Sequence, residues 1–145
     1  MRKIIIFFIL LLYANIVWAD SGEDLFLAAE AGDLAKVEEL IENRVNINWQ
    51  NSDGVSVLMQ AAASNQPEIL NLLLRWGAYF DLQDNDGWTA LMFAARFGHT
   101  KVVQLLLEFG ADVTLYDYNG ANALMLASAH GFTDIVELLE NAGPK

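Results

Sequence analysis

Apolar residues recur along the chain with the spacing of short amphipathic helices that come in pairs. Within residues 84–116, two sets of apolar side chains fall at i, i+3 and i+4, which places each set on one face of a helix. The first set is Leu91, Ala94 and Ala95, and the second is Val103, Leu106 and Leu107. Gly98 and Gly110 are typical helix-ending residues, and Thr89 and Thr100 are expected to cap the two helices.

The same pattern returns at a fixed period of 33 residues. The Leu-Met pairs lie at 58–59, 91–92 and 124–125, and turn glycines lie at 54, 87 and 120. Alanines at 28, 61, 94 and 127 keep the same step. A period between 20 and 50 residues indicates stacked units, each too small to bury its apolar face alone. Such an array presents an extended surface and seldom encloses a catalytic pocket.

The short motifs within each unit resemble those of the ankyrin repeat. They are Asp-Gly at 53–54 and 86–87, Asn-Gly at 119–120, Ala-Ala at 61–62 and 94–95, Gly-His at 98–99, and Gly-Ala-Asp at 110–112. The resemblance covers residues 20–145 and implies an all-α solenoid of helix-turn-helix units joined by short turns or hairpins. About four repeats are expected: 20–50 as N-terminal cap, 51–83, 84–116, and 117–145 as C-terminal cap.

The chain departs from the family pattern at one position of each unit. The family's usual Thr-Pro-Leu-His stretch ends here in Met59, Met92 and Met125, so the imidazole that normally joins a hydrogen-bond network is replaced by a flexible thioether. We expect these methionines to lie in the core. We also expect fewer polar contacts between repeats than the family pattern provides.

The first 19 residues have the features of a secretory signal peptide. A basic start, Met1-Arg2-Lys3, precedes an unbroken apolar run from Ile4 to Leu12. Val17-Trp18-Ala19 then supplies the small residues expected before a cleavage site. The apolar stretch is shorter than the roughly 20 residues of a membrane-spanning helix, so cleavage before Asp20 is favoured over a membrane anchor. A periplasmic or secreted protein without stable membrane insertion is expected. The absence of Cys and of Asn-X-Ser/Thr acceptors favours a bacterial periplasm.

Charge narrows the range of partners. Two of the eight Lys and Arg residues precede Asp20, so the remaining chain carries six against all 19 Asp and Glu, a formal charge of −13. Nucleic acid and anionic lipid would be repelled, and a basic protein is the expected partner of a monomeric domain. The charge could equally serve solubility alone.

No residue pattern indicates a catalytic, metal or cofactor site. His99 and His130 are the only histidines and occupy different positions of their repeats, so zinc is not expected. The segment Asp84-Asn85-Asp86-Gly87 lacks carboxylates at the first and twelfth positions of a calcium loop. No Gly-X-Ser-X-Gly motif is present.

The resemblance places the turn tips and the outer side of each first helix on a concave face, where ankyrin repeats bind partners. Aromatic residues there are suited to be anchors of a protein interface. The nominated residues are Trp88, Phe97, Tyr116, Tyr118, Asp86, Arg96, Asn85, Asp53, Asn119 and His130. Packing roles are instead expected for Trp49, Trp76, Tyr79, Phe80 and Phe109.

Three roles remain open at this point. The first is an inhibitor or immunity protein that blocks a secreted toxin or enzyme. The second is an accessory factor for a periplasmic enzyme, since the resemblance to exported bacterial ankyrin proteins suggests support of catalase in peroxide defence. The third is a hydrolase with an unrecognised carboxylate site.

Overall fold

The computed structural model describes Ile5 and residues 21–143. Eight helices lie within residues 21–143, and no strand accompanies them there. They are α2 (Ser21–Ala31), α3 (Leu34–Glu42), α4 (Val57–Ala63), α5 (Pro67–Arg75), α6 (Ala90–Phe97), α7 (Thr100–Glu108), α8 (Ala123–Ala129) and α9 (Thr133–Asn141). The predicted signal peptide, residues 1–19, lies outside the described residues apart from Ile5. None of the helices described is long and apolar enough to cross a membrane.

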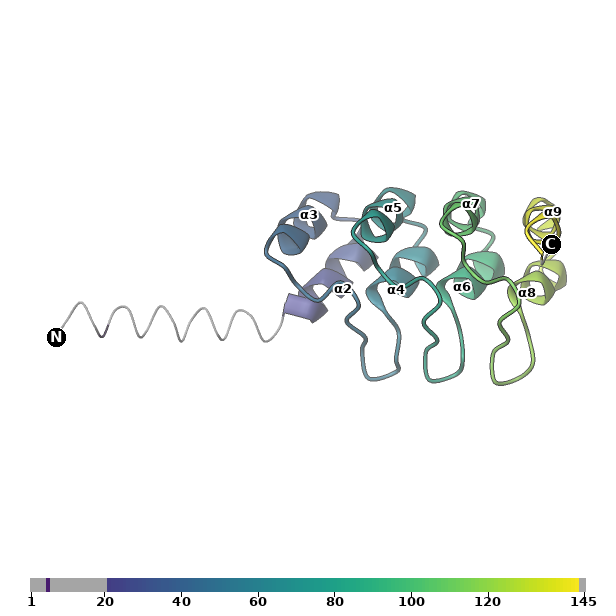
Figure 1. Cartoon of the computed structure of the whole chain (residues 1–145), viewed down its shortest axis with the longest axis horizontal. Helices are drawn as coiled ribbons and strands as arrows, with labels where there is room; N and C mark the ends of the chain where they lie inside the picture. Colours follow the sequence, from purple (N-terminus) through teal and green to yellow (C-terminus); the bar gives the residue numbers. More distant parts are fainter. Residues whose placement is uncertain (1–4, 6–20, 144–145) are drawn as a thin grey trace.

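The helices form two parallel layers. Helices α2, α4, α6 and α8 make an inner layer, and α3, α5, α7 and α9 make an outer layer (Figure 1). Each inner helix contacts the outer helix that follows it and the inner helices of adjacent units. Three loops extend beyond the inner layer on the same side (Figure 1). The predicted all-α solenoid of helix-turn-helix units is therefore confirmed.

The inner helices α4, α6 and α8 begin at equivalent capping residues. The side-chain oxygens of Ser56, Thr89 and Asn122 accept hydrogen bonds from the backbone N–H three residues later, at 3.1, 3.3 and 2.9 Å. Such caps satisfy backbone donors that the helix leaves free. The cap predicted at Thr100 is wrong, because α7 begins at that residue and its N-cap is His99.

The core runs continuously through the stack between the two layers. Met59 and Met92 are each 1% exposed, as expected, but Met125 is 50% exposed. The expectation for Met125 is wrong because α8 has an inner-layer neighbour, α6, on one side only among the described residues.

Hydrogen bonds accompany the apolar packing between adjacent repeats. The His99 imidazole Nε2 lies 3.0 Å from the Ala63 carbonyl oxygen, and the Gln83 amide donates to the Tyr116 carbonyl at 3.0 Å. Other bonds of this kind join Tyr79 N to Asn48 Oδ1, Asp112 N to Asp81 Oδ1, and Thr100 Oγ1 to Asp134 Oδ2. The repeats are thus held together by apolar packing and by hydrogen bonds.

Candidate protein-binding face

The three loops of the concave side share one internal construction. Asn51, Asp84 and Asp117 stand one period apart, and the Oδ1 atom of each accepts two backbone N–H groups of its own turn. For Asp84 the donors are Asp86 at 2.9 Å and Trp88 at 2.8 Å. Because Asp84 and Asp117 are buried, these bonds also satisfy carboxylate oxygens that are removed from water.

Neighbouring turns are bonded to each other. The Asn85 N–H donates to the Asp53 carbonyl at 2.9 Å, and the Tyr118 N–H donates to the Asp86 carbonyl at 3.0 Å. Gly87, at φ +82°, lies under Tyr118, where a Cβ atom would come within 2.9 Å of the Tyr118 nitrogen. Only glycine fits this approach without strain. The turn tips are therefore fixed relative to one another.

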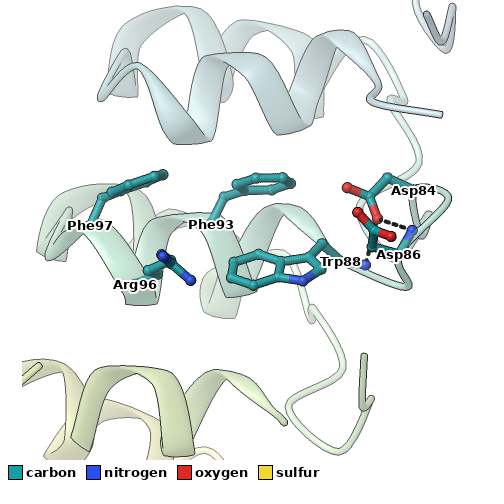
Figure 2. Close-up of a pocket in the computed structure, with 6 residues that line it drawn as sticks. All are labelled: Asp84, Asp86, Trp88, Phe93, Arg96 and Phe97. Carbon is teal, nitrogen blue, oxygen red and sulfur yellow. Dashed lines mark hydrogen bonds between the residues drawn. The ribbon is translucent and has the colours of Figure 1, made fainter. Parts of the chain in front are cut away.

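A shallow cavity of about 270 Å³ lies between the second turn and α6. It is lined by Asp84, Asp86, Trp88, Phe93, Arg96 and Phe97. Figure 2 shows the row from Phe97 through Phe93 to the two aspartates, with Arg96 and Trp88 alongside. The structure thus brings together four of the nominated residues and adds two that were not nominated, Phe93 and Asp84.

The aromatic rings and the guanidinium of this site support one another. The centroids of Trp88 and Phe93 are 5.1 Å apart, and the Arg96 Cζ atom lies 5.4 Å from the Trp88 ring centroid. Trp88 and Phe93 are partly buried, whereas Phe97 is 50% exposed. A cation over an indole contributes about 0.5–1 kcal/mol at an exposed site, so the contact with Trp88 favours this position of the Arg96 side chain only weakly.

The large side chains of this site are particular to the third repeat. One period away from Trp88 stand Val55 and Ala121. One period away from Arg96 stand Ala63 and Ala129. The pair of Trp88 and Arg96 is therefore particular to the third repeat.

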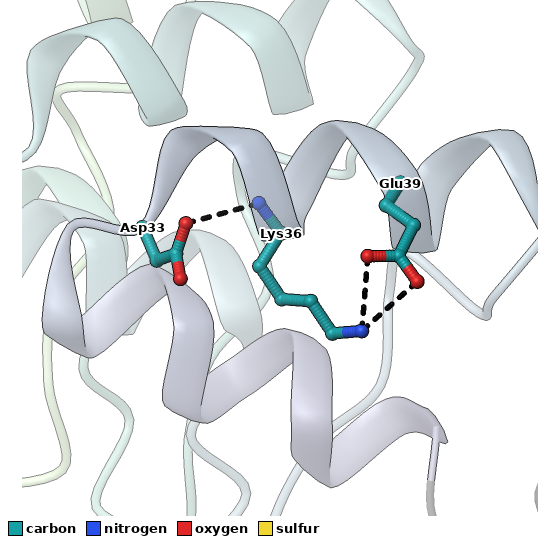
Figure 3. Close-up of polar contacts among 3 residues, drawn as sticks. All are labelled: Asp33, Lys36 and Glu39. Carbon is teal, nitrogen blue, oxygen red and sulfur yellow. Dashed lines mark hydrogen bonds and ion pairs between the residues drawn. The ribbon is translucent and has the colours of Figure 1, made fainter.

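Two charged side chains of this site remain available to a partner protein. In the part of the chain that the structure describes, neither the Asp86 carboxylate nor the Arg96 guanidinium takes part in an ion pair. The pair found there joins Lys36 and Glu39 on α3, at 3.0 Å, beside the Asp33 N-cap (Figure 3). That pair is exposed and lies on the outer layer, so it contributes little to stability.

The remaining nominated residues are dispersed around the cavity. Tyr116 is 51% exposed and lines a separate cavity with Leu124 and Leu139. Tyr118 is 72% exposed on the next turn. The Asn85 side chain donates to the Ser52 carbonyl at 3.0 Å, which gives it a structural bond between turns.

Three other nominated residues lie near the ends of the face. Asp53 and Asn119 are exposed at the turn position equivalent to Asp86. His130 is exposed and stacks on Phe132 with ring centroids 6.1 Å apart, and its Nδ1 atom is 2.9 Å from the Leu126 carbonyl oxygen. These contacts fix the His130 ring at the edge of α8.

Three aromatic residues expected to pack are instead exposed. Trp76, Tyr79 and Phe109 are 58%, 64% and 36% exposed. Trp76 and Phe109 are C-caps of α5 and α7, where a side chain leaves the apolar stripe of the helix. Trp49 does pack, edge to face against Phe26 at 5.6 Å.

Two carboxyl groups of the described residues have lowered pKa values. A hydrogen bond from the Thr100 hydroxyl lowers the pKa of Asp134, and hydrogen bonds from Thr114 lower the pKa of Asp112. Neither carboxyl lines the aromatic cavity. Among the described residues, no group of three or more His, Cys, Asp or Glu side chains is placed to hold a metal ion.

An array of stacked helix pairs with an aromatic face belongs to the class of repeat scaffolds that bind other proteins. Sequence comparison gives the particular family. The family description "Ankyrin repeats (3 copies)" matches residues 25–117 and 58–145, so the chain belongs to the ankyrin repeat family. Such domains are generally non-catalytic interaction modules, and their typical partners are proteins.

Two curated proteins are similar over part of the chain. The palmitoyltransferase Hip14 of Drosophila melanogaster is 36% identical over 61 residues, 42% of this chain and 10% of that protein. Ankyrin repeat and SAM domain-containing protein 6 of Rattus norvegicus is 41% identical over 67 residues, 46% of this chain and 8% of that protein. The aligned part is a tenth or less of either relative, so the similarity concerns a small segment of each.

Proposed function

We propose that this chain is a non-catalytic, exported ankyrin-repeat protein that binds a partner protein through its concave face. The observation that carries the proposal is the cavity lined by Trp88, Phe93 and Phe97, with Asp86 and Arg96 at its edge. A central group of aromatic side chains with a polar border is the usual composition of an interaction hot spot.

The rigidity of the face favours recognition of a folded partner or an ordered segment. Asp84 holds the second turn through two backbone hydrogen bonds, and the turns before and after it are bonded to it. A preformed surface loses little conformational entropy when it binds, so more of the contact energy appears as affinity.

The proposed role is inhibition: the concave face covers the working surface of a basic toxin or enzyme, as an inhibitor or immunity protein does. The formal charge of −13 after residue 19 supports a basic partner, because opposite charge speeds encounter. The N-terminal apolar segment and the small residues before Asp20 support export.

The test begins with identification of the partner by crosslinking in intact cells, affinity capture and mass spectrometry. Affinity is then measured by calorimetry for the parent protein, Trp88→Ala and Phe97→Ala. We expect each variant to lose about 2 kcal/mol of binding free energy, the magnitude typical of an aromatic anchor. Phe97 is included because its ring is half-exposed, so we expect its removal to leave the fold intact.

The matched control is Trp76→Ala, which removes an indole that is 58% exposed on the outer side of the stack. We expect it to bind as the parent does. If Trp88→Ala and Phe97→Ala bind as tightly as Trp76→Ala while all remain folded, the concave face is not the binding surface.

A further inference from the structure

The charges around the aromatic cavity indicate which kind of side chain fits it. Its lining contains two carboxylates, Asp84 and Asp86, against one guanidinium, Arg96. Asp84 is buried and accepts backbone hydrogen bonds, whereas Asp86 is exposed and belongs to no ion pair among the described residues. Asp86 is therefore the carboxylate that remains available to a partner.

The rings offer a second element of recognition. Phe97 is 50% exposed at the cavity rim, and Phe93 lies between it and the aspartates (Figure 2). Arg96 lies over Trp88, 5.4 Å from its centroid, so a guanidinium is already bound to one ring of the site. Aromatic faces attract cations, and a planar guanidinium stacks on them.

The charged residues around the cavity also favour a cation over an anion. The inner helices α2, α4, α6 and α8 and the three turns (residues 50–56, 83–89 and 116–122) contain one Lys or Arg residue, which is Arg96. Asp53, Asp84, Asp86 and Asp117 all lie on those turns. A cation approaching the cavity therefore meets a surface of opposite charge, and an anion meets one of like charge.

We infer that the cavity receives an arginine side chain of the partner protein, which stacks on the Phe97 and Phe93 rings and pairs with the Asp86 carboxylate. The inference rests on the proposed function and adds the chemistry of the partner's anchor. Arginine is preferred over lysine because its planar fork can stack on a ring and donate two hydrogen bonds to one carboxylate.

The experiment uses three tripeptide amides of the form acetyl-Gly-X-Gly-amide, in which X is arginine, glutamine or glutamate. Each is titrated into the 20–145 chain, and the indole N–H signal of Trp88 is followed by NMR. We expect the arginine peptide to shift this signal with an affinity ~10-fold higher than the glutamine peptide, because the glutamine amide carries no charge to pair with Asp86. The glutamate peptide should bind weakest.

The chain provides a matched pair of variants. Asp86→Asn and Glu137→Gln make the same change from a carboxylate to an amide, and both residues are exposed, but Glu137 lies on the outer helix α9, away from the cavity. We expect Asp86→Asn to weaken the arginine peptide ~10-fold and Glu137→Gln to change its affinity less than about twofold, as a distant surface charge does.

Three results would overturn the inference: equal affinity for the arginine and glutamine peptides, tightest binding of the glutamate peptide, or equal effects of Asp86→Asn and Glu137→Gln. Measurements with the captured partner separate this inference from the proposed function. If Trp88→Ala abolishes capture and Asp86→Asn does not alter it, the face binds protein but not through an arginine. If Trp88→Ala and Asp86→Asn both leave capture unchanged while the arginine peptide still binds, the proposed function is wrong but the cavity still binds an arginine side chain.

Discussion

Two methionines at equivalent positions provide a direct test of the stack. Met92 and Met125 are one period apart on inner helices α6 and α8, and each is the residue whose backbone N–H bonds to the N-cap. Met92 is 1% exposed and Met125 is 50% exposed. Substitution by alanine therefore makes the same chemical change in the same local backbone, with burial as the main difference.

The expected magnitudes follow from that difference. Met92→Ala should lower the free energy of unfolding by about 3 kcal/mol, within the 2–5 kcal/mol range for a buried methionine replaced by alanine. Met125→Ala should cost roughly 1 kcal/mol, since only part of its side chain leaves water on folding. Any gain in helix propensity from alanine is the same in both variants and cancels in the comparison.

The assay is urea unfolding followed by circular dichroism at 222 nm, with midpoint and slope fitted for each variant. With a slope of about 1–3 kcal/mol per molar, Met92→Ala should lower the midpoint by about 1–3 M urea. Equal losses of unfolding free energy in the two variants would show that Met125 is buried in solution and that the exposure of α8 described above is wrong. A negligible loss for Met92→Ala would refute the packing of α6 between α4 and α8.

Three further predictions concern the outer layer, a surface carboxyl and the N-terminus. Leu106→Ala should cost about 2–5 kcal/mol in the same urea assay, because Leu106 is 0% exposed and its loss leaves a cavity. Thr100→Val should raise the pKa of Asp134 toward its usual value, as measured by carbon-13 NMR of its carboxyl group. Because this pKa is lowered in the folded protein, the stability that the hydrogen bond provides is present above the usual pKa of Asp and is lost as pH falls through the lowered pKa. N-terminal sequencing of the exported protein should return Asp20, and a return of Met1 would show that the leader is retained.

Much of the fold could be predicted because its information is local and repeated. Caps, helix faces and turn glycines recur every 33 residues, so a weak signal in one unit is reinforced by the others. The sequence favours a cap at Thr100 because a hydroxyl at the first helical residue resembles one at the N-cap, but in the structure this hydroxyl donates to Asp134.

The candidate site was less predictable because it depends on contacts between units. Trp88, Arg96 and Phe97 can be predicted from their positions in the repeat, but Phe93 cannot, because an apolar residue within a helix resembles a core residue. Its register partners in the adjacent units are Gln60, which is polar, and Leu126, which is apolar, so the repeat pattern does not decide which way this position faces. Tyr116 lines a second cavity with Leu124 and Leu139, which belong to the following unit, so the sequence of its own unit does not reveal this placement.

The hydrogen bonds between repeats have a consequence for the speed of folding. Those from Tyr79 to Asn48, Gln83 to Tyr116 and His99 to Ala63 span 31, 33 and 36 residues. Helices contact their own unit and the adjacent ones, so these loop lengths are set by the period and would not grow with the length of the array. Relative contact order, which slows folding as it rises, therefore falls with every unit added. A lengthened version with one more inner repeat should gain stability without the slower folding that a larger globular domain would show.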